Sequence, residues 1–428
     1  MEKLSFTYAL IDVGMVSMIV YGFFTNWKLV PIGAIGLMVY PYAYEPMLKA
    51  VYSALESWFP GVDNHDKKHQ ELRQFKPLVY SDVYNLRVMG IEKRHPFDAS
   101  KYGRVMGYLR DNRHGLDFSV YAETDAPDYK FIYSKIDIQH LLNLNFADYI
   151  AKIAEVPLKY VPASFLRIFA LRRFLYATQG SMKAACLAME NGMAINIGGG
   201  YHHAHRYGGS GFCYYNDIGL VIEHLWKYHP DVRNILIVDL DAHQGNGHEK
   251  DKAYLYQSYN VTSITSQQSS LQSTQSHLLN DQLTSQKQIF IIDIYNPWIF
   301  PGDSEAKKHI DLSVHVDHND DDESYLRKVN SALIKAQSVF NPDFIIYNAG
   351  TDILIGDQLG NLRITPEGVI QRDEAVFRAA RRAGKPILML LSGGYQRSNA
   401  QVIAQSIINL ATIFPELTRT KNTQTARL

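Results

Sequence analysis

The chain has 428 residues with 43 basic and 43 acidic side chains, so its formal net charge is zero. This length allows one large domain or two to three ordinary ones. No lysine- or arginine-rich block stands out, which excludes a dedicated nucleic-acid binder but not a protein that acts on a basic peptide. With only Cys186 and Cys213, the sequence excludes a disulfide framework and a cysteine-based zinc site, and it favours a reducing environment. Any metal must then be held by histidine and carboxylate side chains, which is typical of catalytic ions.

The first 58 residues differ in character from the rest. Two apolar runs, Leu4–Phe24 and Leu29–Tyr44, each approach the ~17–25 residues that a membrane-spanning helix needs. Asp12, inside the first run, is costly at that depth. We predict that residues 4–44 form a helical hairpin that associates with a membrane, with the following domain facing the cytosol. The alternative is a soluble cytoplasmic protein whose hydrophobic hairpin packs on the protein itself or on a partner.

The remainder of the chain predicts one large domain. Residues 59–75 are charged and rich in turn formers, as in a linker. Over residues 76–415, short apolar runs alternate with helical patterns such as 165–191 and 325–340, which predicts an α/β fold with a largely parallel sheet flanked by helices. The predicted strands are Ala194–Ile197, Ile235–Val238, Ile289–Ile292, Phe344–Tyr347 and Pro386–Leu391.

Two polar segments interrupt and end this domain. Residues 257–288, between the second and third predicted strands, are dominated by serine, glutamine and threonine and lack apolar periodicity. We predict a disordered insertion there. Residues 416–428 are predicted to form a polar, frayed tail.

Glycines and polar side chains follow the predicted strands. In an open parallel sheet, ligands bind beyond the carboxyl ends of the strands, so these segments should meet at one edge. At least four such ends on one edge indicate a functional site, whereas one alone is common in structural turns. The segments are Gly198-Gly-Gly-Tyr-His-His203, Asp239-Leu-Asp-Ala-His243, Asp293-Ile-Tyr-Asn296, Asn348-Ala-Gly-Thr-Asp352 and Ser392-Gly-Gly-Tyr395.

The segment after the second strand suits a metal. Asp239, Asp241 and His243 are spaced two apart, and such side chains point to one face of a strand. Converging carboxylates and an imidazole suit a divalent ion of borderline hardness, zinc first. For this triplet alone, a salt-bridged turn that caps the next helix is an equal alternative. Ligation by Asp241, His243 and Asp352 would leave an open position for water, as catalytic zinc requires.

Neighbouring groups could supply the proton transfers. A tight glycine loop could aim His202 and His203 at the bound water as general base and general acid. Asp239 could hold one imidazole and raise its basicity, and Asn246 could hold the other more weakly, which lowers its pKa and suits a proton donor. Tyr395, on a Gly-Gly turn, could donate its hydroxyl to an oxyanion. Together these groups predict metal-assisted hydrolysis of an amide.

This ordered set of motifs resembles the histone deacetylase superfamily, which has the arginase-deacetylase fold. The resemblance runs from about residue 77 to residue 411 and is strongest to the class IV branch. The hydrophobic N-terminal segment and the Ser/Gln-rich insertion have no counterpart in the family pattern. The class IV features are Met89-Gly-Ile-Glu-Lys-Arg-His-Pro-Phe-Asp98, Asn348-Ala-Gly-Thr-Asp-Ile-Leu354, and Tyr295-Asn296 followed by Phe300-Pro-Gly-Asp303.

The resemblance implies a role for each matching residue. The expected zinc ligands are Asp241, His243 and Asp352. A structural potassium ion is expected near Asp239. The expected catalytic groups are His202, His203 and Tyr395, with Asp239 and Asn246 behind the two histidines. The tunnel for an acylated lysine is expected to be lined by Gly211, Phe212, Phe300 and Leu359.

By this resemblance, the protein is a zinc-dependent hydrolase that removes acetyl or long-chain fatty acyl groups from lysine side chains of proteins. A membrane anchor at residues 4–44 would favour the fatty acyl version. One alternative is a small-molecule amidohydrolase such as an acetylpolyamine deacetylase, although the sequence shows no clear acidic tunnel mouth. The other is a non-catalytic scaffold, which the complete set of catalytic residues disfavours.

Overall fold

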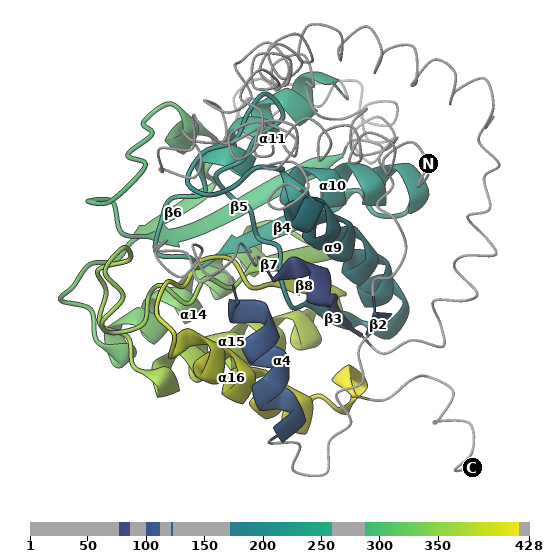
Figure 1. Ribbon diagram of the computed structural model, residues 1–428. Helices are drawn as coiled ribbons and strands as arrows, with labels where there is room; N and C mark the ends of the chain where they lie inside the picture. The colour runs from purple at the N-terminus through teal and green to yellow at the C-terminus, as the bar shows by residue number, and fades with distance from the viewer. Residues whose placement is uncertain (1–76, 86–99, 112–120, 123–171, 259–286, 419–428) are drawn as a thin grey trace, which may run out of the picture.

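A single parallel sheet forms the centre of the protein (Figure 1). The computed structural model describes residues 77–85, 100–111, 121–122, 172–258 and 287–418. Within these residues, eight strands pair in the order β2-β1-β3-β8-β7-β4-β5-β6, and every pair is parallel. The strands are β1 Leu78–Tyr80, β2 Tyr121–Ala122, β3 Met193–Asn196, β4 Asn234–Asp239, β5 Gln288–Tyr295, β6 Leu312–His315, β7 Phe344–Asn348 and β8 Ile387–Leu390.

All five runs that were predicted as strands are strands, and they form the middle of the sheet as β3, β8, β7, β4 and β5. Three strands were not predicted. The strands β1 and β2 are only three and two residues long, and β6 is an edge strand whose residues are half-buried or exposed. Short or half-exposed strands carry little of the continuous apolar signal that marks buried parallel strands.

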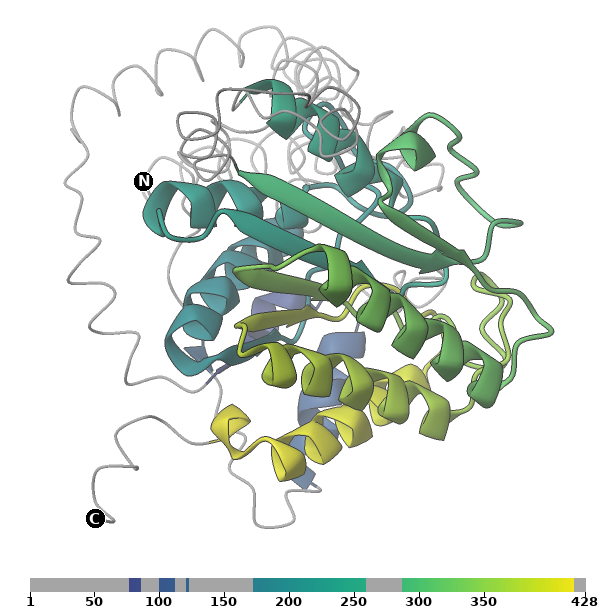
Figure 2. The ribbon, with the colours of Figure 1, turned by 180° about the vertical axis from the view of Figure 1, so that it is seen from behind.

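Helices cover both faces of the sheet (Figures 1 and 2). On one side lie α9, α10 and α11, and on the other lie α14, α15, α16 and α4. This arrangement confirms the predicted parallel sheet flanked by helices. The helices are α4 Lys101–Asp111, α9 Arg172–Asn191, α10 Asp217–Tyr228, α11 Asn246–Ser258, α14 Asp322–Val339, α15 Pro366–Ala383 and α16 Asn399–Ile413, with short 3-10 helices at η2 Asp82–Tyr84, η5 Ala306–His309 and η6 Pro415–Leu417.

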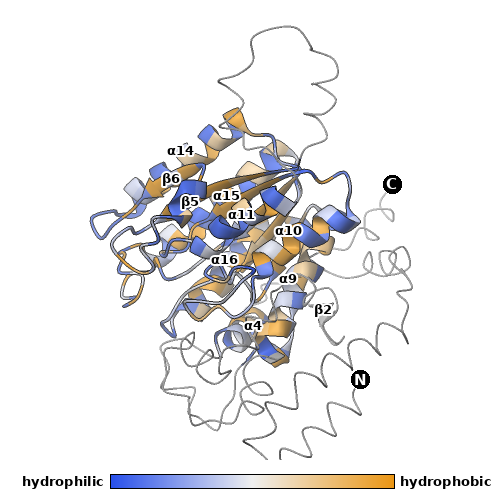
Figure 3. Cartoon of the chain, turned by 90° about the horizontal axis from the view of Figure 1, so that it is seen from above, coloured by the Kyte–Doolittle hydropathy of each residue, from blue (hydrophilic) through white to orange (hydrophobic). Residues whose placement is uncertain are grey.

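The central strands are apolar on both faces because both faces are covered. In β4, Ile235 and Ile237 pack in the hydrophobic layer under α9 and α10, whereas Leu236 and Val238 pack in the layer under α14, α15 and α16. Successive side chains of a strand point to opposite faces, so one apolar run supplies both layers. Figure 3 shows the central strands in the hydrophobic colour range.

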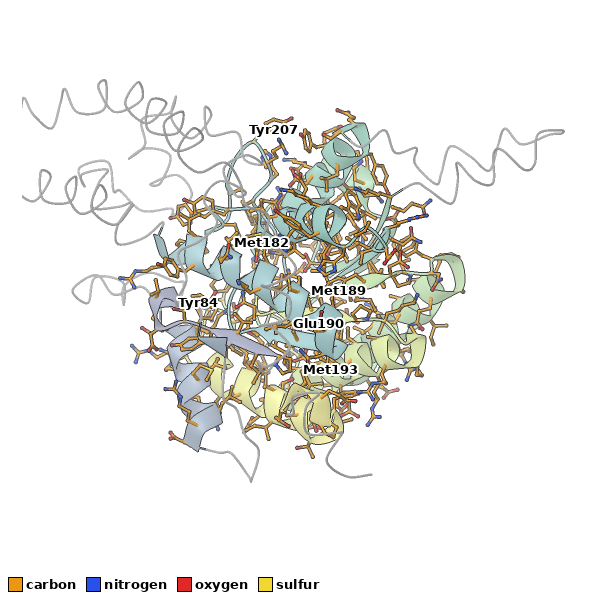
Figure 4. The ribbon with its side chains drawn as sticks, turned by 90° about the vertical axis from the view of Figure 1, so that its right-hand side faces the viewer. Tyr84, Met182, Met189, Glu190, Met193 and Tyr207 are labelled. Atoms are coloured by element: carbon orange, nitrogen blue, oxygen red, sulfur yellow. The ribbon has the colours of Figure 1, made fainter. Side chains whose placement is uncertain are left out.

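The connection between α9 and β3 is a single residue, because the helix ends at Asn191 and the strand begins at Met193. Met182, Met189 and Glu190 mark the course of the helix in Figure 4, and Met193 already begins the strand. The turn between helix and strand is made by Gly192, whose φ of 86° is left-handed and therefore favours glycine. Tyr84 packs beside the helix at Gly180, where a Cβ would collide with the phenol oxygen.

Several boundaries differ from the sequence prediction. The strand β5 continues to Tyr295, so Asp293 lies within the strand and is buried, rather than following it. Leu417, beyond the predicted domain end at residue 415, is buried, and Glu416 pairs with Arg381. The hydrophobic N-terminal segment, the linker over 59–75, and residues 259–286 of the insertion lie outside the described residues. None of the helices within the described ranges has the length and apolarity to span a membrane.

Candidate active site

The candidate site lies where the polar motifs leave the carboxyl ends of four neighbouring strands. In the sheet, β3, β8, β7 and β4 are consecutive, although their sequence positions extend from 193 to 390. Parallel strands place their carboxyl ends at one edge, so residues that are far apart in sequence converge there. Three segments, Gly198–His203, Asp239–His243 and Asn348–Asp352, therefore meet beside the Ser392–Tyr395 turn.

Three predicted ligands converge on one point. Asp241, His243 and Asp352 each offer one ligand atom, and these atoms lie within 4.8 Å of one another. Nδ1 of His243 lies 2.8 Å from Oδ2 of Asp352 and 3.2 Å from Oδ1 of Asp241. All three residues are buried. Two carboxylates around one imidazole nitrogen are a donor set that zinc accepts in catalytic sites.

Glycines make room for this cluster. A Cβ on Gly350 or Gly393 would approach Oδ2 of Asp241 to 2.2 Å or 2.5 Å, which no side chain tolerates. The same oxygen accepts hydrogen bonds from the Gly393 N–H at 2.8 Å and from the Ser392 hydroxyl at 2.9 Å. Asp241 is thus oriented by two donors, while its Oδ1 faces His243. The residues present fit a small divalent cation.

The electrostatics of the cluster also favour a cation. Burial lowers the pKa of His243, but hydrogen bonds to Asp241 and Asp352 and their charges outweigh burial and raise it to about 10. Burial and the nearby Asp241 charge raise the pKa of Asp352 to about 7. The carboxylates of Asp241 and Asp352 repel each other, so this cluster tends to hold a proton. A divalent ion bound there would neutralise the same repulsion.

The two adjacent histidines have different partners. Nδ1 of His202 lies 2.9 Å from Oδ2 of Asp239, and Nδ1 of His203 lies 2.9 Å from Oδ1 of Asn246. The two rings are 4.0 Å apart between centroids, and both residues are buried. The Gly198–Gly200 loop that precedes them contains two left-handed residues, Gly199 and Gly200, which lets the chain turn both imidazoles to the same side.

These partners separate the two imidazoles electrostatically. Burial lowers the pKa of His202, but the charges of Asp241 and Asp239 overcome it and raise it to about 9. The pKa of His203 is held well below its usual range by burial and by the neighbouring His202 and His243. The Asn246 amide only partly offsets this, because it carries no charge. The surroundings therefore favour a proton on His202 more than on His203.

Asp239 accepts hydrogen bonds from four groups. Its Oδ1 accepts from the Asp241 N–H at 3.1 Å and the Asn348 amide at 2.9 Å. Its Oδ2 lies 2.9 Å from His202 and 2.8 Å from Nε2 of His248. Nothing in the sequence pattern around His248 marks it as a partner of Asp239. The three residues of the Asp239–His243 segment therefore have different surroundings. Asp239 contacts His202 and His248, whereas Asp241 and His243 face the candidate metal position.

Tyr395 faces the metal ligands from the Gly-Gly turn. Its ring centroid lies 6.0 Å from those of both His243 and Phe212. Burial, followed by the charges of Asp352 and Asp241, raises its pKa well above the usual value for a phenol. The hydroxyl therefore keeps its proton and can donate it in a hydrogen bond to an oxygen that gains negative charge.

Comparisons with known proteins agree with this geometry. The model of the histone deacetylase domain matches residues 162–411. The chain is 40% identical to histone deacetylase 2 of Arabidopsis thaliana over 78% of each chain. It is 30% identical to an uncharacterized protein of Picosynechococcus over 75% of this chain and 93% of that one, and 32% identical to rice histone deacetylase 1 over 48% and 34%.

The chain belongs to the histone deacetylase family. Membership makes it a hydrolase of the deacetylase type that removes acyl groups from lysine, and the family is zinc-dependent. The relatives do not decide between the classes of the family, so the class IV assignment stays a prediction.

A pocket leads to this deacetylase site. It is open to solvent, and Gly211 and Phe212 are among its lining residues, together with both histidines and Tyr395. Phe300 and Leu359, also predicted to line the tunnel, are not part of this lining. Phe300 is 44% exposed, and its ring lies 5.0 Å from that of His203. Leu359 is half-buried.

Three buried side chains that hold the catalytic loops were missed by sequence reasoning. Asp217 accepts hydrogen bonds from the Gly200 and Tyr201 N–H groups, each at 2.8 Å. Asp357 accepts from the Tyr395 N–H at 2.8 Å. Lys101 donates to the Ser392 and Gly393 carbonyls at 2.6 and 2.9 Å. Their sequence contexts carry no periodicity or spacing that marks them, because their partners lie elsewhere in the chain.

Proposed function

We propose that this protein is a zinc-dependent protein-lysine deacylase, with zinc held by Asp241, His243 and Asp352. The observation that supports it best is the convergence of these three ligand atoms within 4.8 Å, beside a histidine pair and a protonated tyrosine on one pocket. When bound, zinc supplies Lewis acidity for the substrate carbonyl and for a water molecule.

The proton transfers are assigned to the histidines. His203 is neutral and uses Nδ1 towards Asn246, so its Nε2 accepts the proton of the attacking water. It then gives this proton to the lysine nitrogen as the C–N bond breaks, which leaves a carboxylic acid and a free amine; the acid then passes its proton to the amine or to solvent. His202 is oriented beside the reacting centre by the contact of its Nδ1 with Asp239. The Tyr395 hydroxyl donates to the carbonyl oxygen as negative charge develops.

We also propose a structural potassium ion near Asp239. Asp293 on β5 is paired with Asp239 on the neighbouring strand β4. The Oδ1 atom of Asp293 is buried without a hydrogen-bond partner among the described residues. Burial, with the charges of Asp239 and Glu249, raises the pKa of Asp293 well above its usual range. An orphaned carboxylate oxygen in an acidic environment is a group that a cation would satisfy.

Acyl length and location follow as one proposal from residues 4–44. If this apolar segment associates with a membrane, the catalytic domain over 76–415 lies near lipid-modified lysines on the cytosolic side, which favours long-chain acyl substrates. The linker over 59–75 and the insertion over 257–288 would then be accessory to the catalytic domain. The soluble cytoplasmic alternative predicts no such bias.

A matched substrate panel tests this function. Purified zinc-loaded protein, with and without residues 1–58, would be assayed on one peptide that carries acetyl-, octanoyl- or myristoyl-lysine. Turnover of any of these with release of the free acid supports the deacylase. A strong acetyl preference in both forms would exclude the fatty acyl version, and an inactive, zinc-loaded, folded protein would support the scaffold alternative.

A small-molecule amidohydrolase is the second candidate. The three proposed ligands, the histidine pair and Tyr395 act on the amide group itself, so they would serve a small acetylated amine as well as a peptide. N-acetylated polyamines would be assayed beside the peptides under identical conditions. A kcat/KM that is higher for the free amines than for every acyl-lysine peptide would assign the protein to this class.

A further inference from the structure

His203 differs from His202 in the kind of group that holds it. Asp239 is a carboxylate, which only accepts hydrogen bonds, so the nitrogen that faces it must carry a proton. Asn246 is an amide, which presents either an acceptor oxygen or a donor nitrogen. By itself, Asn246 therefore leaves open which nitrogen of a neutral His203 carries the proton. A further contact must choose.

That contact comes from Asp303. The Nδ2 group of Asn246 donates to Oδ2 of Asp303 at 3.3 Å, on the side of the amide opposite His203. If the amide were flipped, its oxygen would face this carboxylate, and two acceptors would repel each other. The carboxylate thus permits one amide orientation, in which Oδ1 faces Nδ1 of His203 at 2.9 Å.

Asp303 is itself held firmly enough to impose this choice. Gln244 bonds its backbone twice, accepting from the Asp303 N–H at 3.0 Å and donating to its carbonyl at 3.0 Å. Oδ1 accepts from the Ala306 N–H at 3.1 Å. Lys250, one turn after Asn246 on α11, pairs with Oδ2 at 2.5 Å. Despite partial burial, Lys250 and these donors hold the pKa of Asp303 at about 2, so the carboxylate stays ionised.

We propose that Asp303 is a positioning residue that orients the Asn246 amide so that its oxygen accepts the Nδ1–H of His203, which leaves Nε2 to face the reacting water. This inference rests on the proposed function, since it assigns the state of a histidine in that reaction. Asn246 relays the effect of the Asp303 carboxylate to His203, so the pair does what a single carboxylate at position 246 would do. A chain with aspartate at position 246 would not need Asp303.

The Asp303→Ala change should therefore have opposite effects on activity in the parent and in a variant with aspartate at position 246. In the parent, Asp303→Ala should lower kcat about 10- to 100-fold with KM changed less than about twofold, as is common when an orienting partner is lost. In an Asn246→Asp background, the two carboxylates would face each other, so the same Asp303→Ala change should restore activity. A purely structural role for Asp303 predicts a loss in both backgrounds, and that outcome would overturn the proposal.

Ring ¹⁵N NMR of histidine-labelled protein provides a readout independent of turnover. The neutral His203 ring should be the Nδ1–H tautomer in the parent and a mixture of tautomers in Asp303→Ala. An unchanged tautomer in the variant would contradict the proposal.

Glu305→Ala is the matched control, because Glu305 is an exposed neighbour that pairs only with Lys308 in the described structure, and it should leave both readouts unchanged. Zinc content and Tm would be measured for every variant. An inactive parent would refute the proposed function instead, while the tautomer measurement would still test Asp303.

Discussion

The proposed metal ligands and the proposed proton-transfer groups are held by different parts of this fold. Asp241 and His243 directly follow β4, and Asp352 follows β7, the strand paired with β4. The histidine pair and Tyr395 instead lie on glycine-containing turns, which are fixed by side chains from α10, α4 and the segment after β7. The strands of the sheet position the proposed metal ligands. Three buried side chains, which we call clamps, position the catalytic groups: Asp217, Lys101 and Asp357.

This difference predicts how each half fails. Loss of a metal ligand should abolish binding of the ion without disturbing the sheet, because the ligands lie beyond its hydrogen-bonded strands. Loss of Asp217 should leave the metal in place and misplace the histidine pair, whereas Lys101 holds the Ser392–Gly393 turn that also donates to Asp241. Variants can therefore be sorted by measuring zinc content and turnover separately.

The largest effect is expected from Asp241→Ala. It removes one of the three proposed ligands, and zinc affinity should fall far enough that the purified protein holds much less than one equivalent. Turnover should drop by at least about 10³-fold, in line with the loss of Lewis-acid chemistry. Zinc content would be measured by metal analysis alongside deacylation. Full occupancy with normal turnover would show that Asp241 is not a ligand.

Tyr395→Phe tests the catalytic half directly. Removing one donor to a developing oxyanion costs about 10²–10³-fold in kcat, and KM and zinc content should stay near the parent values. The phenol oxygen is the only atom lost, so the fold is preserved. A loss confined to KM would mean that Tyr395 binds the substrate equally well before and during the reaction.

Sequence reasoning reached the two halves unequally. The proposed ligand positions could be predicted because Asp241, His243 and Asp352 follow strongly apolar runs within a few residues, and such segments meet at the carboxyl edge of a parallel sheet. Asp217 and Lys101 could not, since each contacts a loop whose position depends on the assembled tertiary structure. The strand β6 was missed for another reason, because its residues are half-buried or exposed. Asp293 was placed after a strand that contains it because its polar side chain ends the apolar run.

Asp217→Ala should show the effect of losing a clamp. The change leaves the Gly200 and Tyr201 N–H groups without their acceptor in a buried site, at a cost of about 1–3 kcal/mol each in unfolding free energy. Misplacement of the following histidines should lower kcat about 10- to 100-fold, with zinc retained. Denaturant unfolding, metal analysis and kinetics would be compared on the same preparation. Loss of zinc in a folded variant would remove the distinction between the two halves.

Lys101→Met should change how the unfolding free energy depends on pH. Lys101 is fully buried, and burial lowers its pKa to about 8 despite the charges of Asp352, Asp241 and Asp357. In the unfolded chain the pKa is about 10.4, so the unfolded state binds the proton more tightly between these values. Raising the pH from about 8 to 10.4 should therefore increase the unfolding free energy of the parent relative to the Met variant, by on the order of 3 kcal/mol.

The same variant should lose activity at a pH where its stability is hardly reduced. Below pH 8 the parent bears the cost of a buried ammonium, and methionine removes that cost while filling a similar volume. The variant also loses both donors to the Ser392 and Gly393 carbonyls, so the turn that carries Tyr395 is released. Urea unfolding at pH 7.5 and pH 10 would be paired with kcat at pH 7.5. A stability difference that does not change with pH would show that Lys101 has the same pKa in the folded and the unfolded protein, so that burial does not depress it. Unchanged kcat would show that Lys101 does not hold the turn.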